Sequence, residues 1–226
     1  MKIAYQGVAG SYSESCAKEK YPDCETIPCK TFDECFEKAN NDSLVKAIIP
    51  ESNKTTGNIG VEYLIFKYRL NIFAEHFFPI NHNLLGLPGS KLSDIKDVYS
   101  HAQALSQSSI FIKKNKLNEN VRADTAGSAK YISEAKDKSK GAISSKLSAD
   151  IYNLQILNSN IQDEKENVTR FLIMQKDIFQ PELQNEKYIT SLLFKLKSKA
   201  GALYSALGSF TLNGVNLTKL QSFPEK

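Results

Sequence analysis

Short apolar runs alternate with helical patterns along most of the chain. Residues 2–5, 26–28 and 46–49 are predicted strands, and residues 31–39 and 61–68 are predicted helices. This alternation is typical of β-α-β units around a largely parallel sheet. The predicted fold class is therefore α/β.

The middle of the chain repeats this alternation after a bend. Residues 72–87 form two extended segments bent at Pro79, which indicates a crossing between two lobes. Beyond the bend, a second set of β-α units includes one helix predicted over residues 102–114. A final strand is predicted over residues 168–175.

The last part of the chain has the pattern of a separate piece. Residues 176–187 are polar and contain one proline, which is typical of a linker. A strand over residues 188–197, a helix over 201–212 and a strand over 215–223 are predicted after it.

The loop after the first strand carries the first candidate chemistry. Gly7 and Gly10 lie in it, and Ser11 and Glu14 have the Ser-x-x-Glu spacing of a helix capping box. Backbone N–H groups at such a loop can hold an anion. The loop lacks the third glycine and the lysine of nucleotide-binding loops, so a tight strand-to-helix turn is the favoured interpretation.

Composition narrows the class of protein. Of 226 residues, 29 are Lys or Arg and 25 are Asp or Glu, a formal charge of +4, and 41% are hydrophobic. These values are those of a globular protein and exclude a disordered or collagen-like chain. The charges are spread without long runs, so no nucleic-acid partner is expected.

Localisation and cysteine chemistry follow from the same survey. No secretory signal follows Met1, and no apolar stretch approaches the roughly 20 residues of a membrane span, so a cytoplasmic protein with no membrane partner is expected. The four cysteines form no CxxC pair and the three histidines are not clustered with them. Free thiols and no metal site are therefore predicted.

Several predicted helix starts combine small hydroxyl or amide residues. Each taken alone is a helix cap, but at the carboxyl ends of the strands of an α/β sheet they describe a cleft of neutral donors for a small carboxylate. They are Asn53 with Thr55-Thr56-Gly57, Ser100-His101 with Gln103, Asp124-Thr125-Ala126-Gly127, and Ser144-Ser145. Arg170, one of three arginines, fits carboxylate recognition and a scaffolding ion pair equally well.

Six sequence blocks follow one another along the chain. They are Ala4-Tyr5-Gln6-Gly7-Val8-Ala9-Gly10-Ser11-Tyr12-Ser13-Glu14, Asn53-Lys54-Thr55-Thr56-Gly57, Ser100-His101-Ala102-Gln103-Ala104-Leu105, Asp124-Thr125-Ala126-Gly127, Ile161-Gln162-Asp163 and Asn167-Val168-Thr169-Arg170-Phe171. In this order they resemble the prephenate dehydratases, in the form shared with the arogenate dehydratases. Gly201-Ala202-Leu203 and Leu217-Thr218-Lys219 resemble the ACT domain appended in this family.

The resemblance implies a fold and an activity. It implies a two-lobed catalytic domain over residues 1–178, built like a periplasmic binding protein, with one lobe of about 1–76 plus 166–178 and the other of about 77–165, followed by a partial ACT domain over 188–226. The family converts prephenate to phenylpyruvate with loss of water and carbon dioxide, and it uses no metal or organic cofactor. Two alternatives stay open: arogenate as the substrate, and a non-catalytic protein that binds a small carboxylate.

The resemblance also implies roles for residues. Thr169 is the principal catalytic residue, which donates a hydrogen bond or a proton to the departing hydroxyl, and Asn53, Ser100 and Gln107 line the substrate pocket beside it. The substrate-binding residues are Thr55, Thr56, Gly57, His101, Thr125, Ala126, Gly127, Arg170 and Phe171, and the regulatory candidates are Gly201, Ala202 and Leu203.

Two departures from the family pattern bear on these roles. Ser52 stands where the family carries a glutamate, and Glu51, one residue earlier, is expected to face the other way because side chains alternate along a strand. The last block contains Phe223 where the family's Glu-Ser-Arg-Pro has arginine, so an L-phenylalanine effector stays open. A homodimer is expected, since an incomplete ACT domain leaves a strand edge that needs a partner.

Overall fold

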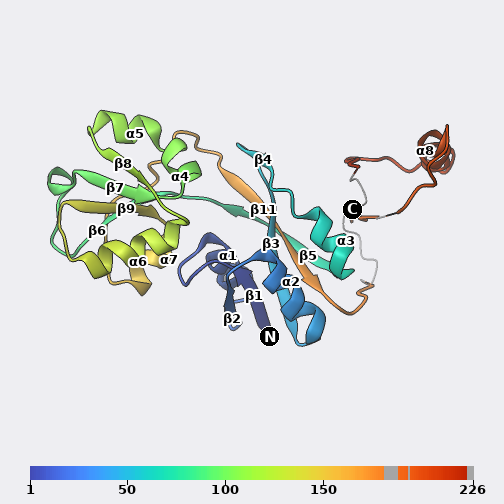
Figure 1. The fold of residues 1–226 in the computed structure, drawn as a ribbon, viewed down its shortest axis with the longest axis horizontal. Coiled ribbons are helices and arrows are strands. Elements are labelled where there is room, and N and C mark those ends of the chain that lie inside the picture. Colours follow the sequence, from blue (N-terminus) through green and yellow to red (C-terminus); the bar gives the residue numbers. More distant parts are fainter. Residues whose placement is uncertain (181–187, 193, 223–226) are drawn as a thin grey trace. The chain divides into compact units, whose positions relative to one another are not determined.

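The computed structural model describes residues 1–180, 188–192 and 194–222. It divides the chain into two compact units, Met1–Pro181 and Glu182–Lys226. The first unit contains two sheets, one in each of two lobes (Figure 1). We term residues 1–79 and 168–180 the first lobe and residues 83–158 the second lobe.

The first lobe is built on a six-stranded sheet of order β2-β1-β3-β11-β5, with β4 paired to β3. Its strands are β1 (Lys2–Gln6), β2 (Glu25–Cys29), β3 (Val45–Asn53), β4 (Gly57–Asn58), β5 (Asn71–Pro79) and β11 (Val168–Gln175). Its helices are α1 (Tyr12–Lys20), α2 (Phe32–Asn41) and α3 (Glu62–Tyr68).

The second lobe is built on a five-stranded sheet of order β10-β6-β9-β7-β8. Its strands are β6 (Asn83–Gly86), β7 (Asp97–Ser100), β8 (Asn118–Val121), β9 (Lys140–Ser144) and β10 (Gln155–Asn158). Its helices are α4 (Ala102–Ser106), α5 (Ser109–Lys114), α6 (Thr125–Ala135) and α7 (Lys146–Ile151), with one 3-10 turn at Leu92–Asp94.

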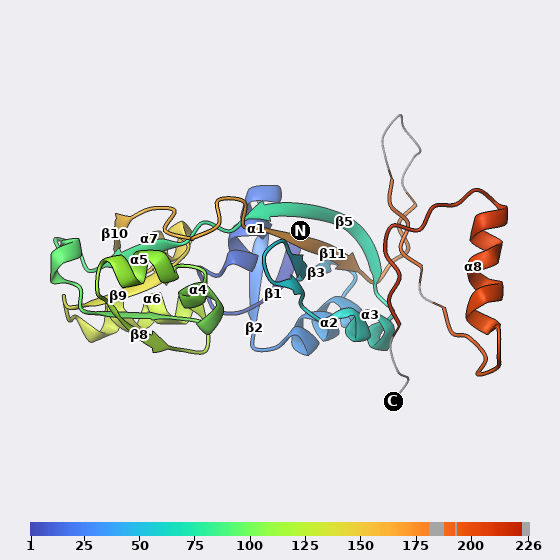
Figure 2. The same ribbon diagram turned by 90° about the horizontal axis from the view of Figure 1, so that it is seen from above.

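Both sheets are mixed, whereas the sequence predicted largely parallel ones. The predicted β-α-β units form the parallel parts, β2-β1-β3 and β8-β7-β9. The antiparallel strands lie next to the crossings between the lobes, and Figure 2 shows β5 and β11 side by side. Because β5 pairs with β11 as far as Pro79, the first lobe extends past the boundary predicted near residue 76.

Each face of the first sheet has its own hydrophobic core, and β11 contributes to both. Phe171 and Ile173 pack on one face, and Leu172 and Met174 pack on the other. A strand that is buried on both faces has a continuous apolar sequence, as residues 171–174 of β11 do. The strand has the bounds that were predicted from the sequence, 168–175. The four cysteines are free, as predicted.

The second unit differs from the prediction. Its described residues form helix α8 (Ala202–Leu212), but no strand forms in the described parts of 188–197 and 215–223. An extended segment is stable only when a neighbouring strand satisfies its backbone groups, and these segments have no such neighbour among the described residues. The predicted partial ACT fold is therefore not observed. Among the described residues, no helix has the length and apolarity to span a membrane.

Candidate active site

Thr169 and Asn53 lie opposite each other on neighbouring strands. The antiparallel register of β11 and β3 pairs these two residues. The Asn53 Nδ2 group donates a hydrogen bond to Thr169 Oγ1 at 2.8 Å, and each residue is 6% exposed. The sheet therefore brings together two of the residues for which the family resemblance implies catalytic or pocket roles.

The orientation of the Asn53 amide is fixed by the main chain. Asn53 Oδ1 accepts hydrogen bonds from the backbone N–H groups of Thr55 at 3.0 Å and Thr56 at 3.2 Å. A backbone N–H can only donate, so the oxygen of the amide must face these groups. The Nδ2 group must then face Thr169 Oγ1 and Asn167 Oδ1, which lies 2.8 Å away.

Gln107 reaches this group from the second lobe. Because Asn167 Oδ1 faces Asn53, its Nδ2 group donates to Gln107 Oε1 at 3.2 Å. The Gln107 Nε2 group then donates to Thr55 Oγ1 at 2.8 Å. Beside it, Gln103 Nε2 donates to Thr56 Oγ1, also at 2.8 Å. Side chains of both lobes therefore meet at Thr55 and Thr56.

The position of Gln107 follows from a break between two helices. The single helix predicted over residues 102–114 is interrupted between α4 and α5, and Gln107 follows the last residue of α4. Asp163, on the segment that returns to the first lobe, causes the break. Its carboxylate accepts from the N–H groups of Ser109 and Ile110, each at 3.1 Å, and its own N–H donates to the Gln107 carbonyl. These bonds replace the helical pattern that a continuous helix would need.

The structure adds residues that the sequence did not single out as site residues. Asn167 belongs to a sequence block that was quoted without a role for it. His82 lies at the crossing after Pro79, and its ring contacts Gln107 Oε1 through Nε2 and the Tyr12 hydroxyl through Nδ1. A histidine beside a predicted lobe crossing is the sequence signal that could have identified it.

The family follows from a comparison of the whole sequence. The family model described as prephenate dehydratase matches residues 3–178, which include all of the polar group around Thr169. The chain belongs to the prephenate dehydratase family.

Individual relatives agree with this assignment. Arogenate dehydratase/prephenate dehydratase 1, chloroplastic, of Arabidopsis thaliana is 40% identical over 100% of this chain and 58% of its own length. The chain thus spans less than two thirds of that relative. Prephenate dehydratase of Staphylococcus aureus has a similar solved structure, with a TM-score of 0.76, 26% identity, and coverage of 99% of this chain and 84% of that one.

A third relative carries a different description. The solved structure described as "GqqA- a novel type of quorum quenching acylases" matches with a TM-score of 0.91 and 33% identity. The match covers 100% of this chain and 82% of that chain. A prephenate dehydratase fold and a protein described as an acylase are therefore both similar to this chain, and the geometry of the site must decide between the two chemistries.

The segment around Ser52, where the prephenate dehydratase family carries glutamate, is irregular. Arg170 pairs with Ser52 and Phe171 pairs with Pro50, so Glu51 is an extra residue in a β-bulge. The burial of residues 51–53 still alternates across the bulge, with Glu51 and Asn53 buried and Ser52 half-buried. The expectation that Glu51 faces away from the position of Ser52 stays a prediction. The Glu51 carboxylate accepts from Ser52 Oγ at 2.6 Å and contacts the Arg170 guanidinium at 3.4 Å.

Arg170 itself is held by carboxylates of its own lobe. Its Nε donates to Glu75 Oε2 at 2.7 Å, and its second contact is Glu51. The structure therefore favours the scaffolding ion pair of the two interpretations. The predicted contact of Arg170 with a substrate carboxylate stays a prediction.

Two other predicted site residues are fully buried. Ser100 is 0% exposed, and its hydroxyl donates to the Ile143 carbonyl at 2.6 Å. Phe171 is 2% exposed and packs edge-on against Phe78 in the core. Both positions are corrected to structural roles, since neither side chain presents a free surface to a ligand.

The remaining candidates lie at turns and helix starts. His101 Nδ1 accepts from the Gln103 N–H, which caps α4, and Gly57 lies opposite Asn53 in the β3–β4 pair. Thr125, Ala126 and Gly127 begin α6, whose cap is Asp124. Gly201 precedes α8, which begins at Ala202 and Leu203 in the second unit. No described hydrogen bond joins these residues to Thr169, and their binding roles stay predictions.

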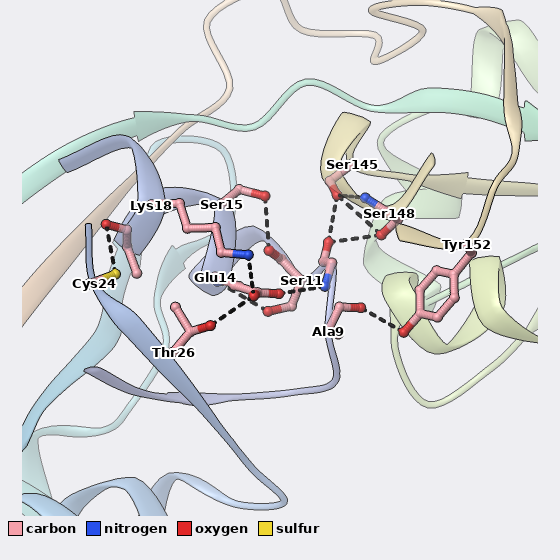
Figure 3. A network of polar contacts seen from close by, with 12 residues as sticks. Ala9, Ser11, Glu14, Ser15, Lys18, Cys24, Thr26, Ser145, Ser148 and Tyr152 are labelled. Atoms are coloured by element: carbon pink, nitrogen blue, oxygen red, sulfur yellow. Dashed lines mark hydrogen bonds and ion pairs between the residues drawn. The ribbon is translucent and has the colours of Figure 1, made fainter. Parts of the chain in front are cut away.

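The Gly7–Ser11 loop is a turn, as favoured from the sequence, and it has a second function in the fold. The Gly10 N–H donates to Glu14 Oε2 at 2.7 Å, so it is not available to an anion. Hydroxyl groups of the second lobe bind the carbonyls of this loop (Figure 3). Ser145 and Ser148 donate to the Gly10 oxygen at 2.5 and 2.8 Å, and Tyr152 donates to the Ala9 oxygen at 2.8 Å.

Proposed function

We propose that the chain removes water and carbon dioxide from prephenate to give phenylpyruvate, with arogenate as the alternative substrate. The direction of one hydrogen bond carries this proposal. The Thr169 hydroxyl oxygen accepts from Asn53 Nδ2, and no described residue accepts the Thr169 proton. That proton is therefore available to the hydroxyl group of a substrate in the cleft.

The reaction needs such a donor. The bond between the ring and its carboxylate breaks, its electron pair enters the ring, and the C4–O bond breaks with its pair on oxygen. Thr169 donates its proton as this oxygen leaves as water and recovers a proton from solvent, so one proton is consumed per turnover. Carbon dioxide is released and the ring becomes aromatic. Positioned proton donation typically contributes about 10²–10⁴-fold to the rate.

The same geometry argues against amide hydrolysis by Thr169. A hydroxyl nucleophile needs an adjacent base that accepts its proton. Asn53 Nδ2 is a donor, and no histidine or carboxylate in the described residues hydrogen-bonds to Thr169 Oγ1. We therefore do not extend the acylase description of the similar structure to this chain.

Turnover of prephenate tests the proposal. The purified chain is incubated with prephenate at neutral pH, and phenylpyruvate is followed by its absorbance in alkali. We expect Thr169→Ala to lower kcat by about 100-fold or more, whereas Thr169→Ser keeps a large part of it because a hydroxyl remains. Thermal unfolding of all three proteins controls for folding. A folded wild-type chain that forms no phenylpyruvate from prephenate would contradict the proposed activity.

Arogenate provides the second arm of this experiment. It carries an amino group in place of the side-chain keto group, and its product is phenylalanine. The Arabidopsis relative is named for both activities, which supports measuring kcat/KM for both substrates. If neither is converted, calorimetric titration with prephenate tests the alternative of a non-catalytic binding protein.

Assembly, regulation and location are further parts of the proposal. We propose a homodimer, supported by the apolar residues that α8 exposes, including Tyr204 at 83% and Leu212 at 89%. We also propose that L-phenylalanine acts at Gly201, Ala202 and Leu203. Light scattering tests the dimer, and inhibition of turnover by phenylalanine tests the effector. The cytoplasmic location stays a prediction.

A further inference from the structure

His82 occupies a fixed place at the junction of the two lobes. It lies between β5 and β6 and is 2% exposed. Its N–H donates to Gln162 Oε1 at 3.0 Å, and its carbonyl accepts from the Ile161 N–H at 2.8 Å. Because Ile161 and Gln162 belong to the segment that returns to the first lobe, His82 joins both crossings of the chain.

The hydrogen-bond partners determine which ring nitrogen of His82 carries the proton. Nε2 lies 2.9 Å from Gln107 Oε1, and Nδ1 lies 2.7 Å from the Tyr12 hydroxyl. The atom of the Gln107 amide that faces His82 is the oxygen, because Asn167 Nδ2 donates to the same atom. His82 Nε2 must therefore donate as well, and in the neutral ring Nδ1 is an acceptor. The Tyr12 hydroxyl proton is then shared between Nδ1 at 2.7 Å and the Asn81 carbonyl oxygen at 3.0 Å. Burial lowers the pKa of His82, which keeps the ring neutral near neutral pH.

With this tautomer, five hydrogen bonds form one chain that runs from Tyr12 to Thr169. In each bond, the group nearer to Tyr12 along the chain donates to the next one. The bonds are 2.5–2.9 Å long. In order, the donors are Tyr12, His82, Gln107, Thr55 and Asn53, and the final acceptor is Thr169.

We propose that His82 is a positioning residue for the dehydratase site. Its Nε2–H holds the Gln107 amide with the N–H side toward Thr55, and this preserves the direction of the chain that leaves the Thr169 proton to the substrate. The inference rests on the proposed function for its effect on rate, and on the hydrogen-bond geometry alone for the tautomer.

The opposite tautomer shows why the position of the proton matters. A bare Nε2 would face Gln107 Oε1 at 2.9 Å, and two acceptors at this distance repel each other. If the amide turned over, its oxygen would face the Thr55 hydroxyl and compete with Asn53 Oδ1 for the Thr55 proton. The chain from the lobe junction to Thr169 would then be interrupted at Thr55.

Kinetics of two variants test the effect on rate. His82→Phe keeps a ring and removes the donor, and we expect kcat for prephenate to fall about 10- to 100-fold with little change in KM, since small displacements of positioned groups cost this much. His82→Gln keeps an N–H donor near Gln107 and should recover most of the loss. His76→Phe, which removes a histidine that pairs with Glu19 on the surface, is the matched control and should keep wild-type kcat.

A spectroscopic measurement tests the tautomer without any need for activity. The chain has three histidines, so ¹⁵N-histidine NMR of the full chain gives three sets of ring signals, and the set missing in His82→Gln belongs to His82. We expect a proton on Nε2 and none on Nδ1. This measurement also holds if the wild type converts no substrate, or if His82→Phe does not fold.

Three results would overturn the proposal. The first is a His82 proton on Nδ1. The second is a folded His82→Phe variant with wild-type kcat. The third is a His82→Gln variant as slow as His82→Phe, because the hydrogen-bond donor would then not be the property that matters.

Discussion

Two contacts between the lobes of the first unit use opposite kinds of group. At the Gly10 contact, hydroxyl groups of the second lobe bind main-chain carbonyls of the first: Ser145, Ser148 and Tyr152 bind Gly10 and Ala9 (Figure 3). At the Gln107 contact, side-chain amides bind side-chain hydroxyls: Gln107 binds Thr55, and Gln103 binds Thr56.

The difference separates a structural contact from a functional one. The bonds from Ser145 and Ser148 are buried, and the loop that accepts them is held by Glu14. The hydrogen bonds that the side-chain amides of Gln103 and Gln107 donate are exposed. An exposed amide exchanges its protein partner for water or a ligand at little cost. We infer that the Gly10 contact sets the distance between the lobes, while a substrate can replace the Gln103–Thr56 hydrogen bond at the Gln107 contact.

The largest expected effect comes from breaking the Gly10 contact with one methyl group. In Gly10→Ala, the new Cβ would lie 2.6 Å from Ser148 Oγ and 2.8 Å from Ser148 Cα, at a φ of +89°. We expect the free energy of unfolding to fall by about 3 kcal/mol, from overpacking and backbone strain together. Urea unfolding monitored by circular dichroism measures it.

Gly60→Ala is the matched control for this substitution. Gly60 has a similar φ of +82°, but no atom lies within 4 Å of the added Cβ. The strain alone should cost about 1 kcal/mol. Equal losses in the two variants would mean that the contact with Ser148 contributes nothing, and the comparison between the two lobe contacts would fail.

The Glu14 carboxylate supports the same contact in a pH-dependent way. Glu14 is 3% exposed and accepts from Gly10 N at 2.7 Å, Thr26 Oγ1 at 2.9 Å and Lys18 Nζ at 2.9 Å. Burial raises the pKa of Glu14. The hydrogen bonds and the charge of Lys18, Gly10 and Thr26 together lower it by more, so the net pKa lies below the ordinary 4.5. The ionised carboxylate therefore stabilises the fold above the unfolded pKa, and this is lost as the pH falls through the folded pKa.

Glu14→Gln isolates this contribution. At pH 7 the free energy of unfolding should fall by about 2 kcal/mol, since hydrogen bonds to a charged group are lost. The gap between wild type and variant should narrow as the pH is lowered below the ordinary pKa. Urea unfolding at a series of pH values measures the gap, and a gap that stays constant down to acid pH would contradict the assignment to ionised Glu14.

Local patterns in the sequence predicted the elements on which both contacts lie. Ser11 caps α1 through the spacing recognised in the sequence. The bounds of β11 were also predicted, and its residues 171–174 form the unbroken apolar run of a strand that is buried on both faces. The family motifs identified Thr169, Asn53 and Gln107, which the structure joins in one group.

What the sequence could not predict depends on distant residues. The break of the helix at Gln107 is caused by Asp163, and neither residue carries a local helix-stop signal. The bulge at Glu51 follows from its pairing with β11. His82 has no motif around it, and its role follows from the orientation of amides on three other segments. Contacts of this kind are decided by the tertiary fold and not by spacing.

The smallest expected effect provides the sharpest comparison, because it matches two hydrogen bonds of equal length. Gln103 Nε2 lies 2.8 Å from Thr56 Oγ1 at one lobe contact, and the Tyr152 hydroxyl lies 2.8 Å from the Ala9 oxygen at the other. We expect Tyr152→Phe to lower the free energy of unfolding by about 1 kcal/mol, since a part-buried carbonyl loses its donor.

Gln103→Ala should change the free energy of unfolding by less than about 0.5 kcal/mol, because water replaces the exposed bond and alanine favours helix α4. Differential scanning calorimetry of both variants with the wild type measures the difference. A Gln103→Ala variant as unstable as Tyr152→Phe would show that the amide contact also holds the lobes together. Breaking the Gln107 contact before substrate enters would then cost free energy. The separation of the two contacts into a structural and a functional one would not hold.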